Sequence, residues 1–171
     1  AVVSSYGANG STTQALVIDT TPPATPSVPT TYKDNAGSIQ SDTSTAPITD
    51  DTTPGINIGT VSAGTTPSLY VDGVKVPATY DPATGTLTPN NPLSEGLHAL
   101  TYTLTDTAGN ESGQSPALNL TVDTTVAAPQ IDSYDDNAGS STGNFGAGTT
   151  TDDTTPTLKG TAEAGSTVKV Y

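Results

Sequence analysis

The sequence contains no cysteine in its 171 residues, and this absence removes several kinds of site together. Without thiols the chain has no disulfide, no thiolate zinc site and no cysteine nucleophile. A small extracellular domain with a thin core usually needs such a staple, so a bound metal or support from neighbouring domains is the remaining way to stabilise it.

Basic side chains are scarce as well. The chain has four Lys and no Arg against 17 Asp and Glu, which gives a formal net charge of −13. Phosphate contacts need a basic face, so we expect no nucleic acid and no anionic membrane surface as a partner, and the natural small partner is a cation. No apolar run approaches the roughly 18 residues of a membrane span. We therefore expect no direct membrane insertion, and we expect any export signal to lie outside this sequence.

The most informative feature that is present is an internal repeat. The string YKDNAGS at residues 32–38, followed by DDTTP at 50–54, returns 102 residues later as YDDNAGS at 134–140 and DDTTP at 152–156. This period is too long for helical solenoid units of about 20 to 50 residues, and it matches the length of one β-sandwich domain. The sequence therefore predicts tandem copies of one domain.

The apolar residues are few, at 32%, but they are patterned as strands. Leu100, Tyr102 and Leu104 alternate with threonines, and residues 118–123 alternate in the same way, which is typical of half-buried strands. Further strand candidates are residues 28–32, 56–58, 69–71, 74–76 and 86–88. Asp72-Gly73 predicts a type I′ hairpin turn, and residues 81–85 predict another turn. We expect an all-β fold of tandem immunoglobulin-like β-sandwich domains, about 100 residues each.

The repeat also predicts the domain limits. LVIDTT at residues 16–21 matches LTVDTT at 120–125, and prolines follow each copy. We expect a strand to end at Asp19 and another at Asp123. Residues 1–21 are then the C-terminal strand of a preceding domain, 22–123 a complete domain, and 124–171 the N-terminal part of a following one.

The acidic residues fall in loops that this strand order places at the two ends of the sandwich. The loops holding Asp34 and Asn35, Asp50 and Asp51, and Glu95 share one end with Asp123. The loops at 62–66 and 106–110 share the other end with Asp19. Like charges about 4 Å apart repel by about 4 kcal/mol at an effective dielectric near 20, and a hard cation such as calcium, which takes six to eight oxygen ligands, removes that repulsion. The alternative is that Asp, Asn and Gly simply form turns in solvated loops.

A family resemblance rests on DDTTPTLKGTAEAGSTVKVY at residues 152–171, DTAGN at 106–110, TVDTT at 121–125 and YDDNAGS. These strings resemble the bacterial Ig-like repeats of large type I-secreted adhesins and biofilm-associated proteins. The resemblance implies a secreted, extracellular stalk on the bacterial cell surface and calcium (Ca2+) near the domain junctions. It further implies neighbouring repeats of the same chain as partners, and a host or abiotic surface contacted through distal parts of the protein.

The resemblance also implies a set of metal ligands. Carried over position by position, they are Asp19, Asp34, Asn35, Asp50, Asp51, Asp106, Asn110, Asp123, Asp136, Asn137, Asp152, Asp153 and Glu163. The complete domain departs from the pattern where Ser62-Ala63-Gly64 replaces Glu163-Ala164-Gly165. We therefore expect two successive junctions to bind calcium unequally.

Two functions remain open, and catalysis is not one of them. His98 is the single imidazole and is expected to point inward in a structural role, while the carboxylates lack the apolar cleft that glycoside hydrolysis needs. The first function is a calcium-stiffened spacer. The alternative is a module that recognises glycan, ice or another surface ligand through exposed threonine rows or tyrosines, although tyrosines filling a Phe-poor core explain most of them.

Overall fold

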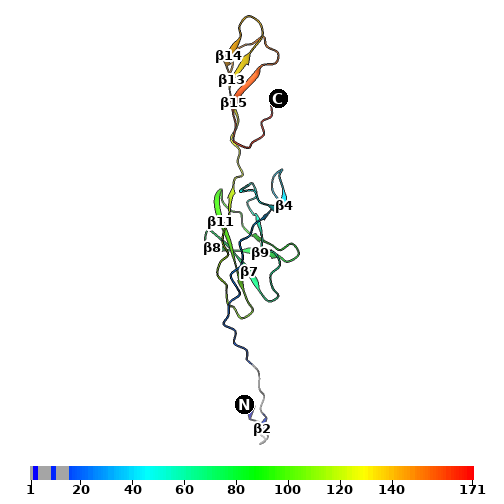
Figure 1. Cartoon of the computed structure of the whole chain (residues 1–171), viewed down its shortest axis with the longest axis vertical. Helices are drawn as coiled ribbons and strands as arrows, with labels where there is room; N and C mark the ends of the chain where they lie inside the picture. The colour runs from blue at the N-terminus through cyan, green and yellow to red at the C-terminus, as the bar shows by residue number, and fades with distance from the viewer. Residues whose placement is uncertain (1, 4–8, 11–15) are drawn as a thin grey trace. The chain divides into compact units, whose positions relative to one another are not determined.

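The computed structural model describes residues 2–3, 9–10 and 16–171, and these residues form strands, turns and loops without any helix (Figure 1). The all-β expectation is therefore confirmed. No described helix is long and apolar enough to cross a membrane. The chain divides into two compact units, residues 1–124 and 125–171, each described by itself below.

Two five-stranded sheets build the first unit (Figure 1). The first has the order β4 (Ser41–Ser44), β3 (Tyr32–Asp34), β6 (Gly55–Asn57), β10 (Thr86–Pro89) and β9 (Ala78–Asp81). The second has the order β5 (Ile48–Thr49), β12 (Leu118–Val122), β11 (Gly96–Thr105), β7 (Thr66–Val71) and β8 (Val74–Val76). All neighbours in these sheets are antiparallel except β5 and β12, which run parallel. The short β1 (Val2–Val3) and β2 (Asn9–Gly10) pair separately.

The core lies between these two sheets and follows the predicted alternation. On β11, Leu100 and Tyr102 are buried and stand opposite Val71 and Leu69 of β7. Buried residues from both sheets complete the cluster, namely Tyr32, Ile56, Leu87 and Leu120. Full burial of such a side chain contributes about 1.5 to 3 kcal/mol, so this cluster is the apolar core that holds the two sheets together.

The hairpin turns form as the sequence predicts. Asp72 and Gly73 both have positive φ, 52° and 80°, as a type I′ turn requires, and they join β7 to β8. Residues 82–85 join β9 to β10, and Gly85 donates its N–H to the carbonyl of Asp81 at 2.8 Å. Local turn chemistry therefore sets the register of these two hairpins.

Two expected strands differ from the structure. Residues 16–18 form no strand, and Leu16, Val17 and Ile18 are 83%, 86% and 78% exposed. Their counterpart β12 has β11 and β5 as neighbours, whereas no strand in the described part of the chain pairs with 16–18. The other strand begins at Tyr32 and not at Val28, because Pro26 and Pro29 in its approach have no N–H for a ladder. Most of the remaining segment 1–15 lies outside the described residues.

The second unit is a three-stranded antiparallel sheet with the order β14 (Gly143–Gly146), β13 (Gln130–Asp136) and β15 (Thr157–Thr161). These strands occupy the repeat positions of β4, β3 and β6 at the offset of 102 residues. Tyr134 of β13 stacks on Phe145 of β14 with ring centroids 5.9 Å apart. The repeat in sequence is thus a repeat in strand order.

Candidate functional site

The repeated acidic motif forms a hydrogen-bonded network in the first unit, beginning with Asp34 at the end of β3. This side chain is 8% exposed. Its Oδ2 accepts the hydroxyl of Thr49 at 2.9 Å, and its Oδ1 accepts the N–H of Ala36 at 3.2 Å. Both carboxylate oxygens are therefore engaged by the protein.

Asp51 completes the network and is 2% exposed. Its Oδ2 accepts the N–H of Asn35 at 3.1 Å, and its Oδ1 accepts the N–H of Thr53 at 2.8 Å. The N–H of Asp51 itself donates to the Thr49 hydroxyl at 3.0 Å. The Thr49 hydroxyl thus links the two residues: it donates to the Asp34 carboxylate and accepts the backbone N–H of Asp51.

The second unit builds the same network 102 residues later. Thr151 donates its hydroxyl to Asp136 at 2.6 Å and accepts the N–H of Asp153 at 2.9 Å. Asp153 accepts the N–H groups of Asn137 at 3.2 Å and Thr155 at 2.8 Å, and these bonds lower the pKa of its carboxyl group. Six hydrogen bonds of the first unit recur between the same atom types.

The first aspartate of each DD pair lies against a glycine of the DNAG string. A Cβ on Gly37 would stand 1.8 Å from Oδ2 of Asp50, and a Cβ on Gly139 would stand 2.0 Å from Oδ2 of Asp152. Both glycines also have positive φ, 60° and 67°. Only glycine suits such a position, so the two repeated strings of the motif are complementary parts of one turn.

Asp123 and Glu95 lie at the same end of the first unit as this network. The N–H of Asp123 donates to the Thr49 carbonyl at 2.8 Å. Glu95 accepts both the N–H and the hydroxyl of Thr124. Asp123 and Glu95 therefore lie at the end of the sandwich where the sequence places them. Asp123 bonds Thr49 through its backbone N–H, and the Glu95 carboxylate accepts donors of the chain that leaves this end.

Asp19, Asp106 and Asn110 meet at the opposite end. Asn110 donates its amide N–H groups to the Asp106 carboxylate at 2.9 Å and to the Asp19 carbonyl at 3.1 Å. The pKa of Asp106 is lowered, chiefly by this bond from Asn110. A Cβ on Gly64 would stand 3.1 Å from Thr107, so the loop at 62–66 lies beside them, as predicted.

Glu163 belongs to the second unit. It accepts the N–H of Ala127 at 2.7 Å. The loop that follows it repeats the one after Ser62: Ser166 donates to the Glu163 carbonyl at 3.1 Å as Thr65 donates to the Ser62 carbonyl. This match supports the predicted equivalence of Glu163 and Ser62, and it gives the glutamate a bond that serine at that position is too short to make.

Calcium takes six to eight oxygen ligands that converge on one point. Among the residues that the structure describes, no three carboxylate or imidazole groups gather into a possible metal cluster. The four buried carboxylates offer a cation fewer free lone pairs, because protein donors already bond both oxygens of each; they are Asp34, Asp51, Asp136 and Asp153. Asp50 and Asp123 present more exposed carboxylate oxygens, the kind of ligand that hard cations prefer. Glu95 is exposed as well, although both of its oxygens already accept the N–H of Thr124.

Most of the described side chains considered for catalysis or binding are buried or bond to other groups of the protein. His98 is 7% exposed and bonds Asp72 and the Ser94 carbonyl, which agrees with its predicted inward orientation. Tyr32, Tyr102 and Tyr134 are buried, as a core role predicts. Tyr171 is fully exposed, and Tyr6 lies outside the described residues.

Sequence reasoning missed Thr49 and Thr151, the residues that hold each network together. The available signal was the threonine that precedes DD in both ITDDTTP and TTDDTTP. It also missed Glu111, which accepts hydroxyls from Tyr70 at 2.8 Å and Thr103 at 2.6 Å. No local sequence pattern marks Glu111, because its partners Tyr70 and Thr103 lie on two other strands, β7 and β11.

Comparison with protein families gives the following result. The family described as the bacterial Ig-like domain matches residues 23–124. A comparison with curated proteins found no match.

Proposed function

Since this chain belongs to the bacterial Ig-like domain family, we propose that it is a structural repeat, a spacer in the stalk of a bacterial cell-surface adhesin. Domains of this family commonly occur in extracellular and surface proteins and are typically non-catalytic. In this role the chain mediates adhesion or biofilm formation by holding a distal adhesive part away from the cell. Its partners are the neighbouring repeats, and the host or abiotic surface is contacted elsewhere.

The observation that carries this proposal is the duplicated network. The most recognisable residues of the repeat bond to groups of their own unit, and they do so identically in two successive units. A recognition site instead presents polar groups to a ligand, and copies of it need not coincide. Identical hydrogen bonds within each unit are what a stack of equivalent structural units requires.

The alternative, a glycan- or ice-binding module, has less support from the outer face of the sheet that contains β11 and β7, where Thr103 is buried. Thr101 and Thr103 on β11 donate their hydroxyls to Gln114 and Glu111 at 2.9 and 2.6 Å. Tyr70 donates to the same glutamate. These hydroxyls already donate to side chains of the same domain, so they do not form a row that is free to bind a ligand. Binding of the whole chain to a glycan array would reverse this order of preference.

Calcium stiffening extends the spacer proposal. The residues that would hold the ion are Asp50, Glu95 and Asp123 at one end of the first unit, and Asp19 with Asn110 at the other. Calcium supplies positive charge that offsets the mutual repulsion of these carboxylates. Extracellular sites of this kind bind in the range of about 10⁻⁴ to 10⁻³ M.

The test is small-angle scattering of the whole chain with calcium and with a chelator. We expect a larger and better defined maximum dimension with calcium, and we expect Asp50→Asn combined with Asp123→Asn to remove the difference. Asp42→Asn is the matched control, because Asp42 is exposed and pairs with Lys33 on β3. Equal maximum dimensions with calcium and with chelator would refute the stiffening. The spacer role itself would not be affected by that result, because the glycan array tests it separately.

A further inference from the structure

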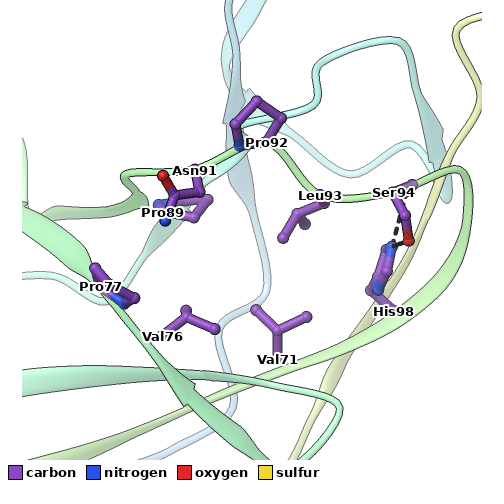
Figure 2. A pocket seen from close by; sticks show the side chains of 9 residues that line it. All are labelled: Val71, Val76, Pro77, Pro89, Asn91, Pro92, Leu93, Ser94 and His98. Carbon is purple, nitrogen blue, oxygen red and sulfur yellow. Dashed lines mark hydrogen bonds between the residues drawn. The ribbon is translucent and has the colours of Figure 1, made fainter.

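His98 on β11 is held by two oxygen atoms that can only accept hydrogen bonds. Its Nδ1 lies 2.8 Å from Oδ2 of Asp72. Its Nε2 lies 2.9 Å from the carbonyl oxygen of Ser94, and Figure 2 shows Ser94 beside the ring. A carboxylate and a carbonyl have no proton to give. Both ring nitrogens must therefore donate, and only the protonated, positively charged imidazole has two N–H groups.

The charges around the ring agree with this state. Burial works against the charge on His98, but the bonds to the Ser94 carbonyl and the Asp72 carboxylate outweigh it, and the pKa of His98 is raised. Asp72 also accepts the N–H of Ala99 at 2.8 Å, and its own pKa is lowered by that bond and by His98. Among the described residues Asp72 is the charged group that acts on the ring; Leu120 faces it from β12.

A second arrangement is available to the neutral ring. The hydroxyl of Ser94 lies 3.5 Å from Nε2, beside the carbonyl that the protonated ring binds. If Nε2 loses its proton, its lone pair faces the lone pairs of that carbonyl, which is repulsive. The hydroxyl can then turn and donate to Nε2, while Nδ1 keeps its proton on Asp72.

We propose that His98 is a proton-operated latch that ties the loop at residues 90–95 to the turn between β7 and β8. In the protonated state it holds the Ser94 carbonyl at 2.9 Å. In the neutral state it loses that bond and keeps only the more distant Ser94 hydroxyl, so the loop is held less tightly. This property is additional to the spacer role, and the hydrogen-bond partners of the ring, Asp72 and Ser94, are not among the residues proposed to hold calcium.

The loop in question contributes to two other features. Leu93 lines a cavity of about 250 Å³, together with Val71, Val76 and Pro89, and Ser94 and His98 close one side of it (Figure 2). Glu95 holds the N–H and hydroxyl of Thr124, at the end of the first unit. Loosening the loop therefore weakens both the wall of the cavity and the contact that fixes the departing chain.

The direction of the effect follows from the raised pKa. The latch contributes fully below the unfolded pKa of about 6.5 and is lost as the pH rises through the higher folded value. The bond between His98 and the Ser94 carbonyl is therefore lost in alkaline solution and kept in acid.

NMR titration of the whole chain tests the latch, because His98 gives the single imidazole signal. We expect a midpoint above 6.5, with the amide signals of Glu95 and Thr124 moving at the same midpoint. Ser94→Ala removes the partner of the neutral ring and should raise the midpoint. Asp72→Asn removes the counter-charge and should lower it by about one pH unit or more.

Asp81→Asn is the matched control, since Asp81 also caps a hairpin turn, bonding Ala83 and Thr84, and does not contact the ring. It should leave the midpoint unchanged. A wild-type midpoint at or below 6.5 would overturn the proposal, as would amide signals of Glu95 and Thr124 that stay constant while the ring titrates. The wild-type titration alone decides the matter if a variant does not fold.

Discussion

At the scale of single residues, Tyr32 and Tyr134 occupy the same repeat position but differ in the hydrogen bonds of their hydroxyls. The Tyr134 hydroxyl bonds Thr149 at 2.9 Å and the Thr150 carbonyl, whereas the buried Tyr32 hydroxyl has no partner in the described structure. Pro47 stands where the second unit has Thr149. An unsatisfied buried hydroxyl costs about 1 to 3 kcal/mol, so its removal should not destabilise the first unit.

We therefore expect Tyr32→Phe to leave the free energy of unfolding of the first unit unchanged or to raise it by about 1 kcal/mol. Tyr134→Phe, the matched change, should lower the stability of the second unit by about 0.5 to 1.5 kcal/mol. Urea unfolding of the two variants measures both. A clear loss of stability in Tyr32→Phe would show that the hydroxyl has a partner in solution.

At the scale of an element, the segment from β3 to β6 depends on one threonine. Thr49 sits on β5, which has two residues and pairs with β12 through a short parallel ladder. A strand this short makes few backbone hydrogen bonds to its neighbour, so the hydrogen bonds of its side chains add to its stability. The Thr49 hydroxyl satisfies Asp34 and Asp51 together, which explains how a polar and acidic segment stays buried beside the core.

Thr49→Val keeps the shape of the side chain and removes its hydroxyl. We expect a loss of about 1.5 to 3 kcal/mol in the first unit, because the buried Asp34 carboxylate loses a charge-assisted bond. The exposed Thr43→Val on β4 is the control and should change stability by less than about 0.5 kcal/mol. Denaturant unfolding compares the two, and equal effects would contradict a special role for Thr49.

At the scale of the whole molecule, the predicted domain limits can be tested directly. Residues 22–123 contain both sheets and the apolar core of the first unit. A chain cut to these limits loses the bonds of Asn110 to the Asp19 carbonyl and of Glu95 to Thr124. We expect it to fold alone, with a melting temperature lowered by less than about 8 °C. Calorimetry measures this, and failure to fold would place part of the core outside 22–123.

Sequence patterns succeeded where structure is local. Alternation located β11 and β12, and Asp72-Gly73 located the turn between β7 and β8, because side-chain parity and positive φ depend on neighbours in the chain. They failed for β4, whose polar SDTS carries no apolar pattern, and for residues 16–18, whose pattern is that of a strand. Whether such a segment pairs depends on which other strands lie beside it.

The sequence by itself determined that this protein is a tandem all-β repeat, because the period of 102 residues and the alternation of apolar residues are visible without the fold. Its lack of cysteine and arginine likewise excluded several kinds of site without the fold. It also marked DNAG and DDTTP as a unit. Only the tertiary structure decided what the buried acids of that unit do. Asp34 and Asp51 meet donors that the chain supplies from 15 or 16 residues away, and a hydrogen bond at that separation exists only once the sheets have formed.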